Sequence, residues 1–458
     1  MNDASNTPDP TRWDRSDERP EPDTGVNPEP MHAAPSPSRR RFLGFAAAGA
    51  VTAGGAAIAL GRGEAGVAGA ASSGTLPAGP TTTTTPVVAS ADVAGRTLVV
   101  VEMQGGNDGL ATLVPRNAGV LYDRRPNLHV PDEELIDFDD DFGLNPNLAA
   151  VAPHGLAALV GVGTVNNPDG SHFEMERRWW AGKSSGASLP ATGFLGRLCD
   201  QLDEGQPVTG VSLGSGATPA LLTAKATTLG MTDPDASWFL RHNEDPWFSS
   251  LRSGLHDMAV PGAGDAVPLL AARSGLGDTL AFADSLSEIE MQNVWDNYPG
   301  SDIGRQFGLA SELIQQEAGL RVIHLSIGSF DTHSDQRGDH DYLLMELSEA
   351  MATFLADIGE RGLADKTLVC TTSEFGRRLP ANGGGTDHGA ASMAFLAGPV
   401  NAGVHGEAPS LTKLDDDNLV ATVDFENYYA TLAEQWFGIP SSEVLESAAP
   451  AIGGLLTT

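Results

Sequence analysis

Short apolar runs recur along this chain and alternate with segments of a different hydrophobic period. The runs are continuous, as expected for strands that are covered on both faces. They are Thr97–Met103, Ala157–Val162, Val208–Leu213, Arg321–Ile327, Thr367–Thr372 and Met393–Ala397. Apolar residues three and four positions apart predict amphipathic helices over 303–314 and 341–358. This alternation predicts an α/β fold with a mostly parallel central sheet.

Two further segments complete the expected fold. Asp424 is placed to cap the last long helix, which ends at Phe437 and Gly438. Residues 214–300 are less regular, with Gly, Pro and Asp breaks, and we expect an insertion or cap over the sheet there. The predicted α/β domain covers residues 93–458 as a whole.

The pattern is missing from the first 92 residues. Residues 1–37 are rich in Pro, Ser and acidic residues, which predicts a disordered segment. Residues 38–71 contain Arg39, Arg40 and Phe42 before a weakly apolar Ala/Gly stretch, and they resemble a twin-arginine export signal. A membrane anchor is the alternative, but a short Gly- and Ala-rich stretch partitions weakly into lipid. The Thr-, Pro- and Ser-rich residues 72–92 predict a linker.

This leader predicts the compartment of the protein. We expect the twin-arginine export machinery as a partner and no stable membrane span after cleavage of the signal. The folded domain would then lie in the periplasm, in the cell envelope or outside the cell.

Charge and cysteine content narrow the function classes. The net charge of -33 excludes nucleic acid as a partner, because no basic surface is left to neutralise phosphates. The acidic excess follows a general composition bias, or it concentrates cations near a metal-binding cleft. Cys199 and Cys370 form one disulfide or remain two buried thiols, and the apolar run around Cys370 favours thiols. Neither alternative provides a thiolate metal site.

Polar motifs follow several of the apolar runs. Carboxylates and imidazoles at the carboxyl ends of parallel strands meet at one sheet edge, where they can bind a divalent metal. We therefore predict a metal site made of Asp108, Asp331, His333, Glu374 and His388. Asp108 lies in a Gly-rich turn and is alternatively the cap of the next helix.

Other residues of these motifs suggest roles around the metal. Asp387 precedes His388 and is placed to orient an imidazole. Arg377 or Arg378 would receive an anionic oxygen, unless Arg377 only pairs with Glu374.

Ser171 and His172 form a further candidate pair. They suggest a nucleophile beside an imidazole, with Ser171 as a helix cap in the alternative reading.

Taken together, the motifs resemble one bacterial family. They are residues 99–110, 171–173, 331–333, 373–377 and 385–389. In this order they are similar to DUF1501, a family of unknown function whose members often carry a twin-arginine leader. The resemblance spans roughly residues 95–440.

The DUF1501 family is in turn distantly similar to the alkaline phosphatase and sulfatase superfamily. This implies a three-layer α/β/α sandwich with one or two metal ions at the carboxyl ends of the strands. The five predicted ligands match the superfamily's metal-binding positions, and Ser171 lies where a nucleophile would fall. Glu374 followed by Phe375 departs from the superfamily's late Asp-His pair, and the sulfatase nucleophile segment is absent.

The resulting expectation is an exported metal-dependent hydrolase or transferase that acts on phosphate or related anionic esters. Mixed carboxylate and imidazole ligands suit Zn or Mn, and Ca or Mg if the acids dominate. Ser171 or water would attack, with His172 beside it and Arg377 holding the substrate's anion. The alternative is a non-catalytic secreted or envelope-associated protein whose cleft binds a ligand or an envelope polymer.

Overall fold

The computed structural model describes residues 93–457 except 186–187, 215, 232–244, 287–288, 290, 318 and 448. The predicted disordered segment, export signal and linker lie outside the described residues. Among the helices that are described, none has both the length and the apolar character needed to cross a bilayer.

A nine-stranded sheet forms the centre of the domain. Its strands are β1 (Thr97–Met103), β5 (Ala157–Gly163), β6 (Gly210–Leu213), β7 (Thr228–Met231), β8 (Val322–Ile327), β9 (Thr367–Thr372), β12 (Ala391–Ala397), β13 (Gly403–His405) and β14 (Val423–Asp424). The order is β13-β5-β12-β9-β1-β8-β6-β7, and β14 also pairs with β5. β1 lies parallel to both β8 and β9, whereas β12 runs antiparallel to β9 and β5. The predicted mostly parallel sheet is confirmed, and every predicted run contains a strand.

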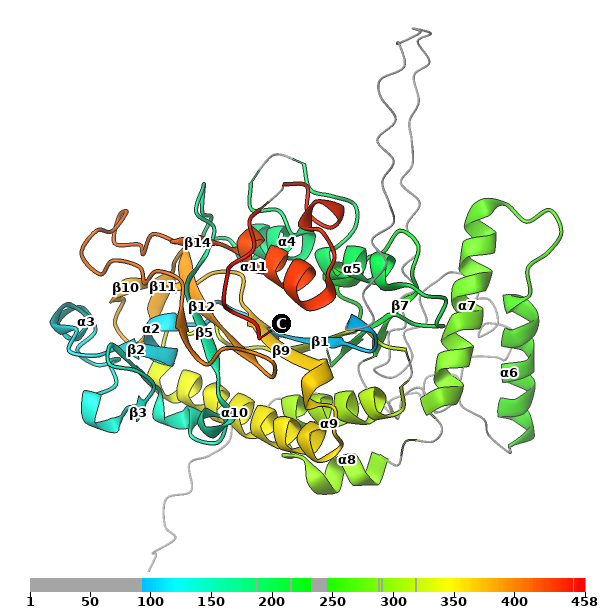
Figure 1. The fold of residues 1–458 in the computed structure, drawn as a ribbon, viewed down its shortest axis with the longest axis horizontal. Helices are drawn as coiled ribbons and strands as arrows, with labels where there is room; N and C mark the ends of the chain where they lie inside the picture. The colour runs from blue at the N-terminus through cyan, green and yellow to red at the C-terminus, as the bar shows by residue number, and fades with distance from the viewer. Residues whose placement is uncertain are drawn as a thin grey trace, which may run out of the picture. The chain divides into compact units, whose positions relative to one another are not determined.

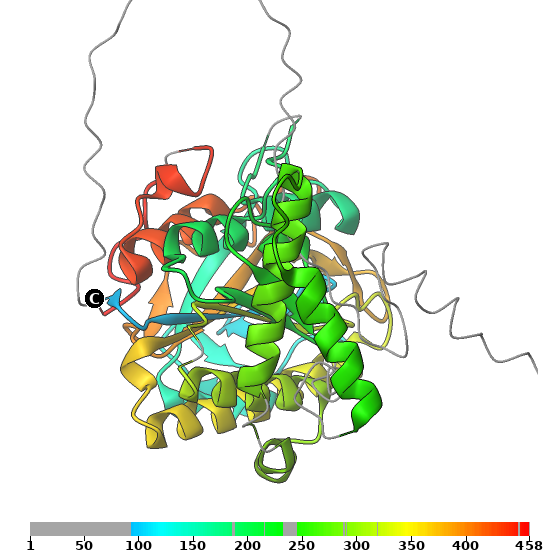
Figure 2. The same ribbon diagram turned by 90° about the vertical axis from the view of Figure 1, so that its right-hand side faces the viewer.

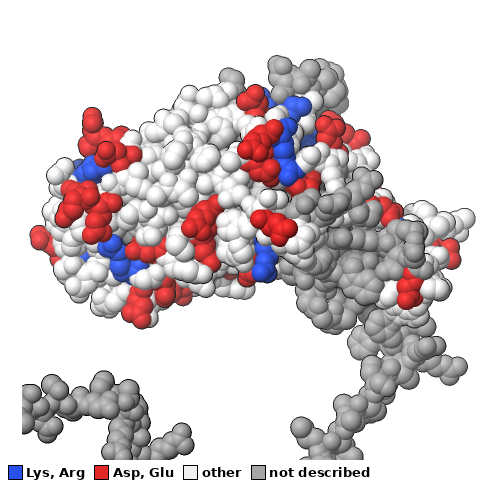
Figure 3. Space-filling model, turned by 90° about the horizontal axis from the view of Figure 1, so that it is seen from below, with Lys and Arg blue, Asp and Glu red and all other residues white. Residues whose placement is uncertain are grey.

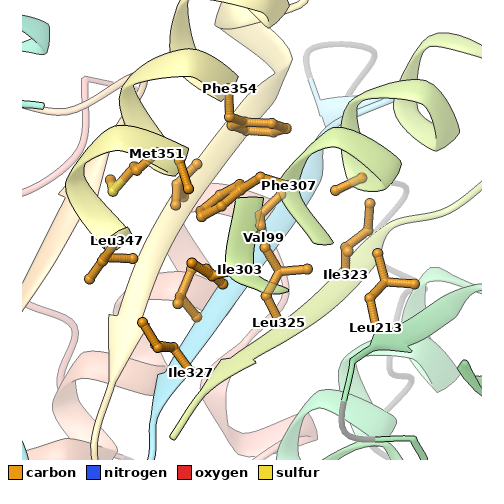
Figure 4. Close-up of a cluster of buried hydrophobic side chains, with 14 of the residues drawn as sticks. Val99, Leu213, Ile303, Phe307, Ile323, Leu325, Ile327, Leu347, Met351 and Phe354 are labelled. Carbon is orange, nitrogen blue, oxygen red and sulfur yellow. The ribbon is translucent and has the colours of Figure 1, made fainter. Parts of the chain in front are cut away.

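Helices cover both faces of this sheet (Figure 1). Alternate residues of β1 face opposite layers, since Leu98 and Val100 belong to one buried cluster and Val99 and Val101 to another. One layer contains α4 (His172–Ala181), α5 (Phe194–Leu202) and α11 (Phe425–Thr431). The other contains α9 (Asp302–Gln315) and α10 (Gln336–Glu360), whose aromatic and aliphatic side chains pack on β1 and β8 (Figure 4). This is the expected three-layer sandwich.

The last long helix begins where the sequence predicted. The Asp424 side chain accepts a hydrogen bond from Glu426 N and so caps α11. A π-helical turn over Leu432–Trp436 continues α11 up to Phe437.

Smaller elements follow the carboxyl ends of β1 and β9. They are α2 (Gly109–Thr112), α3 (Gly119–Arg124), β2 (Leu113–Pro115), β3 (Ile136–Asp137), β4 (Phe142–Leu144), β10 (Arg377–Ala381) and β11 (Thr386–His388). β2, β4 and β3 form a three-stranded sheet, and β10 pairs antiparallel with β11. The polar motifs therefore lie in turns and short strands at this edge of the main sheet.

The described part of the segment expected to be irregular includes the helices α6 (Pro246–Ala259), α7 (Val267–Ser285) and α8 (Met291–Asn297). α6 and α7 lie side by side (Figure 2). Pro246 opens α6, where a proline does not interrupt helical hydrogen bonds, and Asp245 caps the same end. Pro246 and Pro268 therefore mark helix starts instead of irregular chain.

Cys199 in α5 and Cys370 in β9 are both buried and free. Burial raises the pKa of the Cys370 thiol to about 12. The structure thus has two buried thiols, as the apolar surroundings of Cys370 suggested.

Candidate metal centre

Three distant segments bring a carboxylate and three imidazoles together. Asp331 and His333 lie in the loop between β8 and α10, His388 ends β11, and His172 begins α4. Since Asp331 comes four residues after the end of β8, the group lies at the carboxyl edge of the parallel strands. Ligands of open α/β sheets usually bind at this edge.

The atoms that face one another are all possible metal ligands. Oδ1 of Asp331 lies 2.9 Å from Nε2 of His388 and 3.1 Å from Nε2 of His333. The two Nε2 atoms are themselves 2.9 Å apart. Nε2 of His172 lies 3.4 Å from Oδ2 of the same aspartate. Ligand atoms of His172, Asp331 and His388 all lie within 4.8 Å of one another.

These separations match the size of a coordination shell. Bonds of about 2.0–2.1 Å from a metal to its ligands place neighbouring ligand atoms about 2.9 Å apart in an octahedron. The same bonds give about 3.3 Å in a tetrahedron. The donor atoms of His172, Asp331 and His388 therefore fit one divalent ion, and His333 contacts two of these three groups.

Two of the imidazoles have a hydrogen-bond acceptor behind them, and His333 has a more distant carboxylate. Nδ1 of His388 lies 2.7 Å from the Gly170 carbonyl oxygen, and Nδ1 of His172 lies 2.7 Å from Oε1 of Glu374. Nδ1 of His333 is 3.6 Å from Oδ1 of Asp387. Metal-binding histidines characteristically have such a partner, because it fixes the ring and its tautomer.

The hydrogen-bond pattern requires a positive charge inside the cluster. Because Gly170 O and Glu374 Oε1 accept, the hydrogens of His388 and His172 lie on Nδ1. In the neutral rings the Nε2 lone pairs then face the Asp331 carboxylate, which also only accepts. Two acceptors 2.9 Å apart repel each other unless a proton or a metal ion lies between them.

The pKa shifts agree with this arrangement of charge. Burial opposes ionisation of Asp331, but hydrogen bonds with His388 and Arg377 hold the pKa of its carboxyl well below its usual value. The hydrogen bond from His172 to Glu374 raises the pKa of that imidazole, against the opposite effect of burial.

Glu374 was expected to bind the metal directly, and the structure places it behind His172. The Glu374 side chain is buried, and its Oε1 accepts a hydrogen bond from Gly105 N at 2.8 Å. The next residue, Phe375, packs its ring on His172 and His388 with centroids 4.8 and 4.5 Å away. Both residues therefore position imidazoles.

Arg377 was expected to hold the substrate's anion, but its side chain is fully buried. Its guanidinium donates to the carbonyls of Gly106, Thr386 and Phe330 and to Oδ1 of Asp331. A ligand from solvent does not reach this group, so Arg377 instead fixes the loops that carry the cluster.

Arg378 is partly exposed. It donates to the His388 carbonyl and lies 3.8 Å from Asp416.

Asp108 was expected among the ligands, and the structure gives it the alternative role of a helix cap. Its buried carboxylate pairs with Arg125 at 2.6 Å, and it accepts hydrogen bonds from Gln336 and from Leu110 N. Burial would raise the pKa of this carboxyl, but the charge of Arg125 keeps it below its usual value. These contacts tie Asp108 to α2, α3 and α10 and not to the four-residue cluster.

Ser171 occupies the N-cap position of α4, directly before His172. Its side chain is exposed and does not cap the helix. The adjacent carbonyl of Gly170 holds His388, so the serine belongs to the same loop as the cluster.

Sequence reasoning missed several residues that organise this edge. Arg125 and Gln336 bind Asp108, and the Gly170 carbonyl orients His388. No local motif surrounds Arg125 or Gln336. The carbonyl of Gly170 is a backbone group, which a sequence pattern does not reveal. His172 was identified, but as a partner of Ser171 and not as a fourth group of the cluster.

Comparison with known proteins gives a family and a set of distant structural neighbours. The family described as "Protein of unknown function (DUF1501)" matches residues 95–436. A search of functionally curated proteins gave no match.

Three solved structures illustrate the neighbours. The lipoteichoic acid synthase LtaP from Listeria monocytogenes is 8% identical with a TM-score of 0.37, over 77% of this chain and 74% of that one. PsFucS1 sulfatase from Pseudoalteromonas sp. is 12% identical with a TM-score of 0.34, over 78% and 73%. The alkaline phosphatase from the Antarctic bacterium TAB5 is 10% identical with a TM-score of 0.30, over 68% and 94%.

Because these TM-scores are below 0.5, the ligands and activities of those proteins do not bear on this chain. The family match is different in kind, since it extends from the start of β1 to the end of the last helix. The chain belongs to the DUF1501 family.

Proposed function

We propose that the protein is an exported metal-dependent hydrolase or transferase that acts on phosphate or related anionic esters. One divalent ion would be held by His172, Asp331, His333 and His388. The observation that carries this proposal is the orientation of the imidazoles. Two of them hydrogen-bond outward through Nδ1 and direct Nε2 at a single carboxylate.

The ligand set favours zinc or manganese. Three imidazoles and one carboxylate suit these ions, whereas calcium and magnesium prefer shells made of oxygen. When bound, such an ion polarises an ester oxygen and lowers the pKa of a coordinated water. Its positive charge also explains why the substrate would be an anion.

The protein's own residues would prepare the site for this chemistry. Glu374 keeps the Nδ1 hydrogen of His172 in place, so that Nε2 remains free. The buried Arg377 guanidinium donates a hydrogen bond to Oδ1 of Asp331 at 2.9 Å and so holds this carboxylate in place. The side chains of Asp331 and His333 are each 44% exposed, so a substrate can approach the cluster from solvent. Ser171 or water would be the nucleophile, since the exposed serine precedes His172.

A non-catalytic protein that binds a ligand or envelope polymer in the same cleft is the second candidate. The burial of Arg377 favours it, because phosphoryl-transfer sites usually present a cation to the substrate and this one is covered. Under this proposal any bound metal would be structural.

Elemental analysis and esterase assays on one set of variants test the enzyme proposal. We expect about one zinc or manganese ion per chain, and hydrolysis of p-nitrophenyl phosphate or of its diester or sulfate analogues. His388→Ala should lower metal affinity at least tenfold and abolish turnover. The exposed His154 lies outside the cluster, so His154→Ala is the matched control and should change neither quantity.

Two results would contradict the proposal. One is substoichiometric metal that is unchanged in His388→Ala. The other is a full metal complement without hydrolysis of any of the three ester types, which would support the binding protein instead.

A further inference from the structure

A cavity opens at the same edge of the sheet. It has a volume of about 1060 Å³, slightly above the roughly 300–1,000 Å³ typical of small-molecule sites. The carboxyl ends of β6, β7 and β8 form its floor, and α8, α9 and α10 contribute its walls. None of the residues predicted as ligands or catalytic groups lines it.

The loop after β8 contributes both to the cavity and to the candidate metal centre. Ser329 lines the cavity and lies only two residues before Asp331. Two residues of fully extended chain span at most about 7 Å, so one ligand of modest length can reach both places.

The connecting loop is held in an unusual conformation. Ser329 has a φ of +76°, which side chains rarely adopt and which costs on the order of 1–3 kcal/mol. The neighbouring residue holds it there: Phe330 N donates to the Gln104 carbonyl, and the Phe330 carbonyl accepts from Arg377. Such strain is concentrated at functional sites.

The cavity presents aromatic rings to solvent. Trp295 of α8 is 46% exposed and Tyr342 of α10 is 55% exposed, and both line it. An exposed aromatic face offers a flat apolar surface for the C–H face of a sugar ring. Two exposed rings beside charged side chains are unlike a hydrophobic core.

The polar groups of the cavity suit hydroxyls more than anions. Asp302 and Glu346 offer carboxylate oxygens, one of which accepts from the Tyr342 hydroxyl, and the Arg305 guanidinium lies 3.9 Å from Asp302. Among the described residues that line the cavity, two acids and one base give a local negative charge, which repels a phosphate or sulfate. An anionic group would therefore prefer the metal centre and leave the cavity to an uncharged part.

We propose that this cavity binds the neutral, hydroxyl-rich portion of the substrate, a sugar residue or short uncharged oligosaccharide, whose anionic ester group lies at the metal centre. The aromatic pair, the carboxylates and the shared loop carry this assignment. This assignment extends the proposed function. Its link to an ester at the metal centre rests on that proposed function.

Calorimetric titration of the full-length protein with neutral hexasaccharides tests the assignment. The probes are the β-1,4-linked hexaoses of glucose and of N-acetylglucosamine, and EDTA is present so that metal does not contribute. We expect saturable binding of at least one hexaose. Trp295→Ala and Tyr342→Ala should each weaken it at least tenfold.

Two variants serve as controls. Trp247 is 52% exposed on α6 and does not line the cavity, so Trp247→Ala should bind like the wild type. His388→Ala should also bind like the wild type, because the cavity does not need the metal.

Absence of saturable binding to both hexaoses would overturn the assignment. Equal weakening by Trp247→Ala would also overturn it, because the rings of the cavity would then have no special part. Sugar binding by a protein that takes up no metal would refute the proposed reaction and leave the cavity as a sugar site.

Discussion

At the residue scale, the groups behind the imidazoles matter as much as the imidazoles. Glu374 is buried, accepts hydrogen bonds from Gly105 N and His172, and so keeps the His172 ring in one tautomer. A carboxylate in this position also makes the ring nitrogen that faces Asp331 more basic.

Glu374→Gln removes that charge with little change of shape. We expect metal affinity to fall about 10–100-fold, because an amide orients the ring but does not increase its basicity. Competition against a fluorescent zinc chelator measures the change. An affinity within twofold of the wild type would show that the charge of Glu374 does not strengthen metal binding through His172.

Glu176 lies one turn after His172 in α4. Burial, together with the charges of Glu374 and Glu102, raises the pKa of its carboxyl to about 7. The folded state therefore holds this proton more tightly than the unfolded state. That stabilisation is complete below the unfolded pKa near 4.5 and is lost as pH rises through 7.

Glu176→Gln removes this titration. In EDTA we expect the variant to be about 1 kcal/mol more stable than the wild type at pH 8, after allowance for the partial exposure of the carboxyl. At pH 4 the two should be equally stable. Urea unfolding at both pH values measures the difference, and the exposed Glu360→Gln is the control. A gain in stability of the same size at both pH values would contradict the raised pKa of Glu176.

At the element scale, the turn after β1 is fixed by one buried ion pair. Arg125 pairs with Asp108 and also donates to the carbonyls of Leu379 and Arg378 in β10. It therefore joins α2, the end of α3 and β10. Removing either charge leaves the other buried without a partner.

Arg125→Met should lower the free energy of unfolding by about 3–5 kcal/mol. Adding Asp108→Asn to that variant should restore part of the loss, because the unpaired charge is removed. Denaturant titrations of both variants measure this. A single variant within 1 kcal/mol of the wild type would show that the pair is not important for stability.

The strands and motifs differ in how far the sequence could predict them. Strands such as Thr97–Met103 and Thr367–Thr372 were predicted with the bounds that they have, because a fully buried strand leaves a continuous apolar run. Motif position also led to Asp331, His333 and His388. The helix-cap role of Asp108 was one of two predicted alternatives, but its ion pair with Arg125 was not predictable, because packing brings Arg125 beside it.

At the scale of the whole molecule, negative charge is widely spread. Acidic side chains lie in several groups on one face of the molecule, where basic side chains are few (Figure 3). The net charge of -33 raises the local concentration of divalent cations and disfavours anions away from a bound metal.

Metal binding should therefore appear in the stability of the whole domain. With metal at one hundred times its dissociation constant, linkage predicts about 2.7 kcal/mol of stabilisation. In a domain of this size that amounts to a rise in Tm of about 3 °C. Scanning calorimetry with zinc and with EDTA measures it. An identical Tm in His388→Ala with and without zinc would place the effect at the cluster, and a persistent rise would place it elsewhere.

The wide sequence separation within the metal centre has a kinetic consequence. Gly170 and His388, which share a hydrogen bond, are 218 positions apart. A partly folded chain that lacks β8 or β11 has no complete ligand set, and long loops make such contacts form late. During refolding, metal would therefore bind only after the last step of assembly. Metal uptake would distinguish the folded domain from a compact intermediate.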